Sequence, residues 1–175
     1  SRAARRMVTP PSLSAGLQRP SPHRVMTQGS PGTTVRVSVS SEGVEANGNS
    51  QYPSISTDGR YVAFASTATN LVTDDTNGKQ DIFVHDLHTG QTTRVSVSWS
   101  GEQANDASDN PSLSADGRYV AFESLATNLV ISDTRNYKQV FVHDLETGTT
   151  SLVSVNTQGE GALYGAELPA ISGDG

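Results

Sequence analysis

An internal repeat of 58 residues constrains this chain more than any other feature. The segment PSISTDGRYVAF at residues 53–64 returns as PSLSADGRYVAF at residues 111–122, and PAISGDG opens a third copy at Pro169. Residues 53–98 and 111–156 share 29 identities in 46 positions without a gap. A fixed period without insertions indicates one structural unit that is stacked on its neighbour.

Composition favours an all-β unit. Hydrophobic residues make up 34% of the chain, which contains 16 glycines and 8 prolines, and such a turn-rich profile is typical of β-proteins. The chain has no cysteine, so disulfides cannot hold the fold together. No run of 18 apolar residues is present, so we expect no membrane span.

Each copy contains four β-prone runs. In the first copy they cover residues 52–56, 60–66, 81–87 and 92–98. The dipeptide Asp58-Gly59 between the first two predicts a hairpin with a type I′ turn, which requires positive φ at both central residues. Four antiparallel strands in up-and-down order, repeated head to tail, describe β-propeller blades.

The predicted fold is therefore all-β, with propeller blades of four antiparallel strands and a 58-residue repeat. Two blades are complete, and a third copy covers one strand up to Gly175. Because the two faces of a blade are apolar and closed propellers usually have about four to eight blades, we expect either a piece of a longer polypeptide or a unit that self-associates. We favour the first, with further blades in cis.

The repeat resembles the TolB-like group of WD-like β-propeller repeats. The resemblance covers residues 34–175 and lies in the proline-serine strand, the Ser-x-Asp-Gly turn and the segment FVHDL. It implies a periplasmic or extracellular, bacterial protein and says little about activity. The 58-residue unit exceeds the usual blade of about 40–45 residues, so the excess is expected in loops.

Charge divides the chain into two parts. Residues 1–33 contain five arginines and no acid and are rich in proline, so we predict a disordered basic leader. Residues 34–175 then contain seven basic and 18 acidic residues, a net charge of −11. An acidic repeat region argues against nucleic acid as a partner.

The long connections of each copy are expected on one edge of the blade. In an up-and-down sheet, alternate loops lie on opposite edges, and the connection 67–80 and the interblade segment 41–51 share an edge. Long loops in compact proteins are often functional. The acids on this edge are Glu42, Glu45, Asp74, Asp75, Glu102, Asp106, Asp109 and Asp133.

A calcium site is one interpretation of the segment DDTNGKQD. Asp75, Asn77 and Asp81 offer oxygen ligands at alternating positions, as calcium loops do. The second copy has Arg135 and Gln139 at the last two positions, so a metal shared by every blade is disfavoured. An Asx-turn within the loop is the competing interpretation.

Two other repeated pairs have structural and chemical interpretations. Ser56 and Asp58 resemble a nucleophile with an acid, but their repetition favours a hydroxyl that stabilises the turn. His85 and His143 also recur at the period, and we expect surface or interblade histidines rather than zinc ligands. Glu123 stands where the first copy has Ala65 and could supply one carboxylate of a glycosidase-type pair with a loop acid. Nothing in the sequence fixes the separation of such a pair, so we favour chance variation.

The sequence thus predicts a non-enzymatic scaffold without catalytic or cofactor-binding residues, which binds a protein or glycan through an acidic long-loop face. One alternative is the accessory propeller of an extracellular hydrolase, a peptidase or glycosidase, whose catalytic part lies outside this chain. The other is a calcium-binding propeller.

Overall fold

The computed structural model describes residues 32, 34–132, 134 and 136–175, and the predicted leader lies almost entirely outside this part. The described residues form eight strands and no helix, which confirms the all-β prediction. The strands are β1 (Ser50–Ile55), β2 (Tyr61–Ser66), β3 (Asp81–Asp86), β4 (Gln91–Arg94), β5 (Ser108–Leu113), β6 (Tyr119–Ser124), β7 (Gln139–Asp144) and β8 (Thr149–Leu152).

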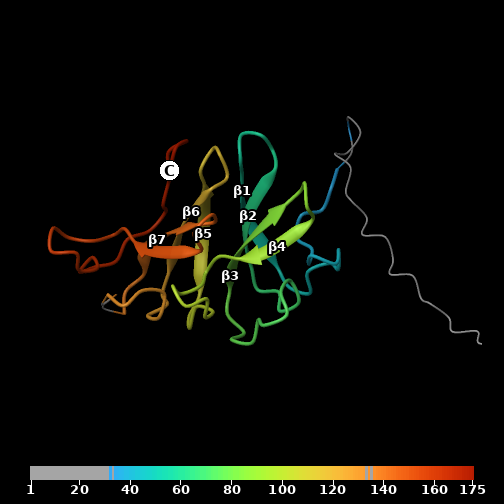
Figure 1. Cartoon of the computed structure of the whole chain (residues 1–175). Coiled ribbons are helices and arrows are strands. Elements are labelled where there is room, and N and C mark those ends of the chain that lie inside the picture. The colour runs from blue at the N-terminus through green and yellow to red at the C-terminus, as the bar shows by residue number, and fades with distance from the viewer. Residues whose placement is uncertain (1–31, 33, 133, 135) are drawn as a thin grey trace, which may run out of the picture.

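The strands form two antiparallel sheets with the predicted order. One sheet is β1-β2-β3-β4 and the other is β5-β6-β7-β8, and the two lie side by side (Figure 1). The register repeats as well, because Phe64 faces Phe83 in the first sheet and Phe122 faces Phe141 in the second. Each phenylalanine pair is stacked, with ring centroids 6.0 and 5.8 Å apart.

The main hydrophobic core lies between the two sheets. Small and branched side chains of the first sheet, including Ala63, Ala65 and Ile82, pack against Phe122 and Phe141 of the second. A smaller cluster on the opposite face of the first sheet is formed by Phe64, Phe83, Ala68 and Leu71. The β2 strand is therefore covered on both faces, as its weakly alternating sequence predicts.

Hydrogen bonds between successive copies explain the repeated proline-serine strand. The Ser54 hydroxyl accepts from the Leu113 N–H at 3.0 Å, and one repeat later Ser112 accepts from the Ile171 N–H at 3.3 Å. The hairpin turns are joined in the same way, since the Thr57 N–H donates to the Ala115 carbonyl at 2.9 Å. The third copy therefore makes the same bonds to the second sheet, but residues 165–172 form no strand, so the strand predicted for the third copy is wrong.

The predicted type I′ turn at Asp58-Gly59 is wrong. Of Asp58 and Gly59, only Gly59 has a positive φ, at 73°. The Gly59 N–H donates to the Ser56 carbonyl at 2.9 Å, so Thr57 and Asp58 are the two central residues of the turn. The Ser56 hydroxyl donates to the Asp58 carboxylate at 2.6 Å and accepts from the Tyr61 N–H at 2.9 Å. This side chain stabilises a loop of four residues, 57–60, between the paired Ser56 and Tyr61, which is two residues more than a type I′ hairpin has.

The short turns and the long connections lie on opposite edges of the sheets, as predicted. In Figure 1 the β1–β2 and β3–β4 turns lie above the sheets, and the connections 67–80 and 95–107 lie below them. The β3–β4 turn is held by the Asp86 carboxylate, which accepts from the His88 N–H at 2.8 Å. The same carboxylate accepts from the Nε and Nη2 atoms of Arg60. The lower edge is called the long-loop edge from here on.

The fourth strand is shorter than predicted. The prediction covered residues 92–98, but β4 ends at Arg94. The chain then turns back on itself through an isolated bridge between Val97 and Gln103, and equivalent bridges join Val39 to Glu45 and Val155 to Gly161. These turns belong to the interblade connections rather than to the sheets.

Candidate functional site

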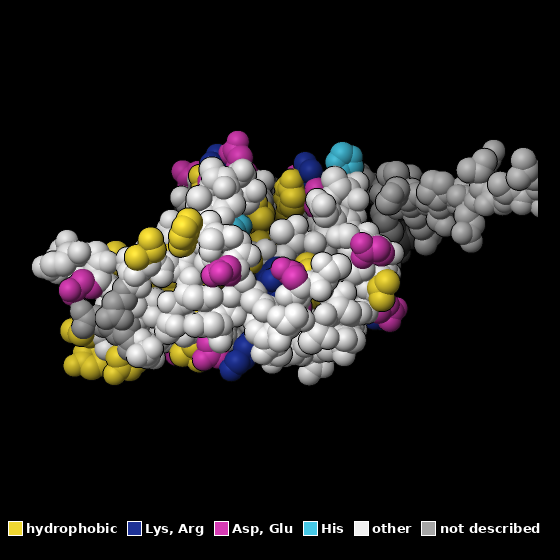
Figure 2. Space-filling view, turned by 60° about the horizontal axis from the view of Figure 1, so that its bottom comes forward, with side chains coloured by type: hydrophobic (Ala, Val, Ile, Leu, Met, Phe, Trp, Pro, Cys, Tyr) yellow, Lys and Arg dark blue, Asp and Glu magenta, His cyan; other side chains and the backbone are white. Residues whose placement is uncertain are grey.

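Two connections of the long-loop edge are bonded to each other. The Gln103 amide donates to the Thr76 hydroxyl at 2.6 Å and accepts from the Thr76 N–H at 3.3 Å. Lys79 forms an ion pair with Asp106 at 3.0 Å. The edge is therefore a continuous surface over both sheets, and Figure 2, which brings it forward, shows acidic side chains spread over it.

Arg94, at the end of β4, organises the buried part of this edge. Its guanidinium binds the exposed Asp74 carboxylate at 3.1 Å and the Gln103 side-chain oxygen at 3.2 Å. Its Nε atom is buried and has no hydrogen-bond partner among the described residues. The sequence prediction did not include Arg94, although its replacement by Leu152 in the second copy marks it as special to the first.

Two of the predicted calcium ligands are buried carboxylates. Asp75 is 8% exposed, and neither of its carboxylate oxygens has a hydrogen-bond partner among the described residues. Burial raises the pKa of Asp75, and the Arg94 charge opposes part of that rise. Burial also raises the pKa of Asp81 to about 6, although Ser96 donates a hydrogen bond to this carboxylate at 2.6 Å.

Asn77 uses its side chain within the loop. Its oxygen accepts from the Lys79 N–H at 2.7 Å, and its NH₂ group donates to the Ala104 carbonyl at 2.8 Å and to Asp81 at 3.3 Å. The predicted Asx-turn is thus confirmed. Of the three predicted ligands, only Asp75 has oxygens without a partner in the described part of the chain.

The fit to calcium is therefore partial. The donor set is one free carboxylate, and the neighbouring Arg94 guanidinium repels a cation. Within the residues that the structure describes, no cluster of three or more His, Cys, Asp or Glu side chains could hold a metal ion. Calcium binding stays a prediction, which now depends on Asp75.

The second copy shows what Asp81 and Asn77 contribute to the fold. Gln139 stands at the position of Asp81; its oxygen accepts from Ser154 at 2.6 Å and its NH₂ group donates to the Ala162 carbonyl at 2.9 Å. One neutral amide thus makes the bonds that Asp81 and Asn77 share in the first copy. This equivalence indicates a structural role for both residues.

The paired histidines are buried within the sheets rather than placed on the surface. His85 is 1% exposed, and its Nδ1 lies 2.8 Å from the Thr92 hydroxyl, which donates its proton to the Val39 carbonyl. The imidazole is therefore the donor to Thr92. His143 repeats this arrangement with Thr150, and burial lowers the pKa of both imidazoles.

Glu123 binds the third copy. It is 2% exposed and accepts from Lys138 at 2.7 Å and from the Leu168 N–H at 2.9 Å. One carboxylate oxygen thus joins the second sheet to the segment that follows, and the other pairs with Lys138 of the β6–β7 connection. The sequence marked this position through the change from Ala65 to Glu123.

Two four-stranded meanders stacked face to face, with long loops on one edge, define the architecture. These sheets are β-propeller blades. No protein-family model and no curated protein matches the chain. The blades are similar in structure to a protein described as TolB from Agrobacterium tumefaciens, with a TM-score of 0.43 and 19% identity over 62% of this chain and 31% of that one.

Other similar structures also contain propellers. TolB from Acinetobacter baumannii has a TM-score of 0.39 and 19% identity over 62% of this chain and 22% of that one. The β-propeller domain of the Trilobed protease from Pyrococcus furiosus has a TM-score of 0.38 and 18% identity, over 61% of this chain and 27% of that one. The chain thus spans less than a third of these proteins. In its described part, no helix is long and apolar enough to cross a membrane.

Proposed function

We propose that the two blades are a non-enzymatic scaffold that binds a protein or glycan ligand through the long-loop edge, outside the cytoplasm. The observation that supports this most directly is the division of the blade into a repeated, tightly bonded framework and one divergent edge. The interblade bonds of Ser54 and Ser112 are the same in both copies. The long-loop edge carries acids and differs between the copies.

The two edges of the blades offer a direct test. A photo-crosslinking amino acid is placed on the long-loop edge at Thr76 or Glu102, and on the hairpin edge at Thr89 or Thr147, all of which are exposed. Each variant is incubated with the secreted and periplasmic fractions of the source organism and with an immobilised glycan panel. We expect adducts from the long-loop positions. Adducts confined to the hairpin edge, or equal from both edges, would contradict the proposal.

An accessory propeller of an extracellular hydrolase is the alternative. The complete reading frame distinguishes the two proposals, because a Gly-x-Ser-x-Gly elbow followed by Asp and His elsewhere in the protein would favour the hydrolase. Additional blades or a binding module would favour the scaffold.

Calcium binding is supported by one observation, the buried Asp75 carboxylate without a hydrogen-bond partner. A ligand that binds the folded state raises its stability by RT ln(1 + [L]/Kd). If Asp75 binds calcium, millimolar calcium raises the Tm of the wild-type chain and not that of Asp75→Asn, with magnesium as the control ion. An unchanged wild-type Tm would remove calcium from consideration.

A further inference from the structure

The contacts that hold the second blade on the first recur one repeat later. The Ser108 N–H donates to the Gln80 carbonyl at 2.8 Å, and the Ala166 N–H donates to the Lys138 carbonyl at 2.9 Å. The bonds of the serine strand repeat in the same way. Residues 166–175 thus lie on a surface of the second blade that corresponds to the surface of the first blade on which the second one packs. Figure 1 shows this C-terminal segment beside the second sheet.

The tyrosine that begins the second strand of each blade lies against the turn glycine of the next copy. A Cβ atom at Gly117 would overlap the Tyr61 ring, and a Cβ atom at Gly175 would overlap the Tyr119 ring. No residue with a side chain fits either position unless the tyrosine moves. The hairpin turn of each copy is therefore shaped to fit the blade that precedes it.

A residue in the left-handed conformation precedes the proline of every copy. The φ angle is 53° at Tyr52, 49° at Asn110 and 55° at Leu168. This conformation is unfavourable for residues other than glycine, so the surrounding structure has to maintain it. In the third copy the Leu168 N–H donates to the Glu123 carboxylate of the second blade at 2.9 Å. The backbone of Tyr52 has the same conformation and can present its N–H to the same kind of acceptor.

The corresponding face of the first blade is exposed in the described part of the chain. Ile55 is 60% exposed and Tyr52 is 50% exposed, whereas Leu113, the equivalent of Ile55, is 7% exposed. Apart from the residues next to Gly59 in sequence, no described atom lies within 4 Å of the place where a Cβ of this glycine would be. Ala3 stands where an earlier copy would need its tyrosine. The first blade thus keeps a stacking face that the leader sequence does not match.

The first blade and residues 166–175 carry the same set of stacking groups. The segments 53–59 and 169–175, PSISTDG and PAISGDG, share five of seven residues. The Gly173 carbonyl accepts from the Ala115 N–H at 3.1 Å, and Thr57 is its exposed counterpart. The remaining counterparts of Ala166, Leu168, Ile171 and Gly175 are Ser50, Tyr52, Ile55 and Gly59.

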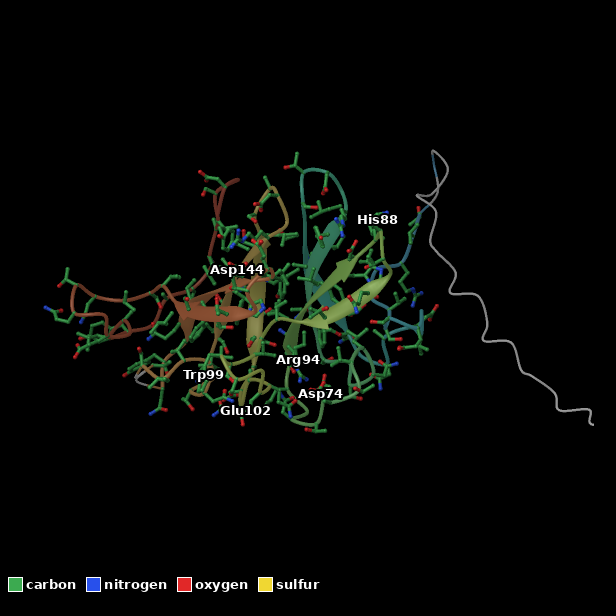
Figure 3. The ribbon with its side chains drawn as sticks, viewed as in Figure 1. Asp74, His88, Arg94, Trp99, Glu102 and Asp144 are labelled. Carbon is green, nitrogen blue, oxygen red and sulfur yellow. The ribbon has the colours of Figure 1, made fainter. Side chains whose placement is uncertain are left out.

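The surface of the second blade that accepts these groups spans its full height. It extends from the hairpin edge, where Figure 3 labels Asp144, to the long-loop edge, where the same figure labels Glu102. One surface therefore fits two segments of the same chain.

Residues 166–175 cover this surface less completely than a whole blade does. Val140 and Val142 of β7 are only half-buried, whereas their equivalents Ile82 and Val84 are 0% and 4% exposed beneath the second blade. The segment forms no strand, and its Leu168 side chain is 75% exposed. A segment with few buried apolar contacts opens at a low cost in free energy, so a complete blade can compete with it.

We propose that the first blade of one copy of this chain docks head to tail on the second blade of another copy, in the place that residues 166–175 hold. Such a contact joins two different surfaces, so copies add until a ring closes. Because closed propellers have about four to eight blades, two to four copies would complete one. The inference goes beyond the proposed binding at the long-loop edge, because it uses the flat faces of the blades.

One substitution at two equivalent positions tests the proposal in the 175-residue chain. We expect the wild-type chain to be monomeric at low micromolar concentration, because residues 166–175 compete for the surface. Ile171→Asp weakens the docked segment and is expected to strengthen association at least about tenfold, which corresponds to about 1.4 kcal/mol. Adding Ile55→Asp to this variant places a charge on the incoming face and is expected to reverse the gain. Sedimentation velocity over a concentration series measures both effects.

Two further variants guard against a trivial loss of structure. Gly175→Val releases the third turn without a change in any strand and is expected to act like Ile171→Asp. Leu163→Asp is the control, because Leu163 is 58% exposed outside the matched contacts, and it should associate like wild type. All variants are compared at wild-type far-UV circular dichroism.

A crosslink locates the contact. A photo-crosslinking phenylalanine replaces Tyr52 in the Ile171→Asp variant, which is mixed with an isotopically labelled copy that lacks the probe. We expect mass spectrometry to find adducts between residue 52 of one copy and residues 119–142 of the other.

Three results would overturn the inference. The first is that Ile171→Asp and Gly175→Val both stay folded and monomeric at every concentration. The second is association that Ile55→Asp leaves unchanged. The third is a crosslink from residue 52 to the first blade of the other copy, which would indicate a symmetric dimer instead. None of these results bears on adducts from Thr76, so the scaffold proposal is tested separately.

Discussion

Single buried charges distinguish the first blade from the second. Asp75, Asp81 and Arg94 form a charged group in the first blade, whereas Gln139 and Leu152 occupy two of the equivalent positions in the second. Burying an ionised carboxylate costs free energy unless it is paired. The same positions are therefore filled by charged side chains in the first copy and by neutral ones in the second. The effect of the charge on the free energy of unfolding is measurable as a function of pH.

We predict that Asp81→Asn stabilises the chain at pH 7.5. The folded-state pKa of Asp81, about 6, lies above the ordinary value of 3.8. Its contribution to stability is therefore full below about pH 4 and is lost as the pH rises through about 6. The variant should gain about 1–3 kcal/mol at pH 7.5 and almost nothing at pH 4 in urea denaturation.

Asp106→Asn is the matched control for this pH profile. The ion pair with Lys79 lowers the pKa of Asp106, which is the opposite direction, so this variant should not be stabilised at pH 7.5. An Asp81→Asn variant less stable than wild type at pH 7.5 would show that the Ser96 and Asn77 bonds outweigh the cost of the buried charge.

The hairpin between the first two strands of a blade depends on a serine rather than on a type I′ turn. Ser56 is 3% exposed and Ser114 is 0% exposed, and each hydroxyl makes the same two bonds. Ser172 bonds to Asp174 at 2.8 Å but lies exposed in the third copy. The repeat thus places one motif in two environments.

We predict that Ser56→Ala and Ser114→Ala each cost about 1–2 kcal/mol of unfolding free energy, because each removes an acceptor from a backbone N–H near the core. Ser172→Ala should cost less than about 0.5 kcal/mol. Chemical denaturation of the three variants measures this. Equal losses in all three would mean that the turn, rather than its burial, determines the effect.

The stacking of the blades determines which copies of an apolar residue are buried. Leu113 is 7% exposed between the blades, whereas its equivalent Ile55 is 60% exposed. Phe122 and Phe141 likewise fill the space over Ala63 and Ala65. The same strand position therefore contributes differently to stability, according to whether a blade covers it.

We predict that Leu113→Ala costs about 2–4 kcal/mol, as deletions in a packed core do, and that Ile55→Ala costs less than about 1 kcal/mol. The measurement is urea denaturation followed by far-UV circular dichroism. A cost for Ile55→Ala equal to that of Leu113→Ala would mean that another part of the protein covers the first blade in solution.

The blade and its strand order follow from local information in the sequence. Strand alternation, glycine turns and the exact period are properties of short segments, so they predict four antiparallel strands and two edges with short and long loops. Residues such as Ser54 and Ser56 recur because each copy makes the same bonds. Calcium at Asp75, Asn77 and Asp81 was inferred from ligand spacing alone.

Only the tertiary structure decided how distant residues meet. It placed Arg94 beside Asp75, engaged Asn77 in its own loop, and joined Glu123 to the backbone of Leu168. The physical reason is that burial and charge pairing arise between segments that are far apart in the chain, whereas strand propensity acts between neighbours. The repeat alone made blades predictable, and the packing of one copy on the next determined which polar groups are left without a partner.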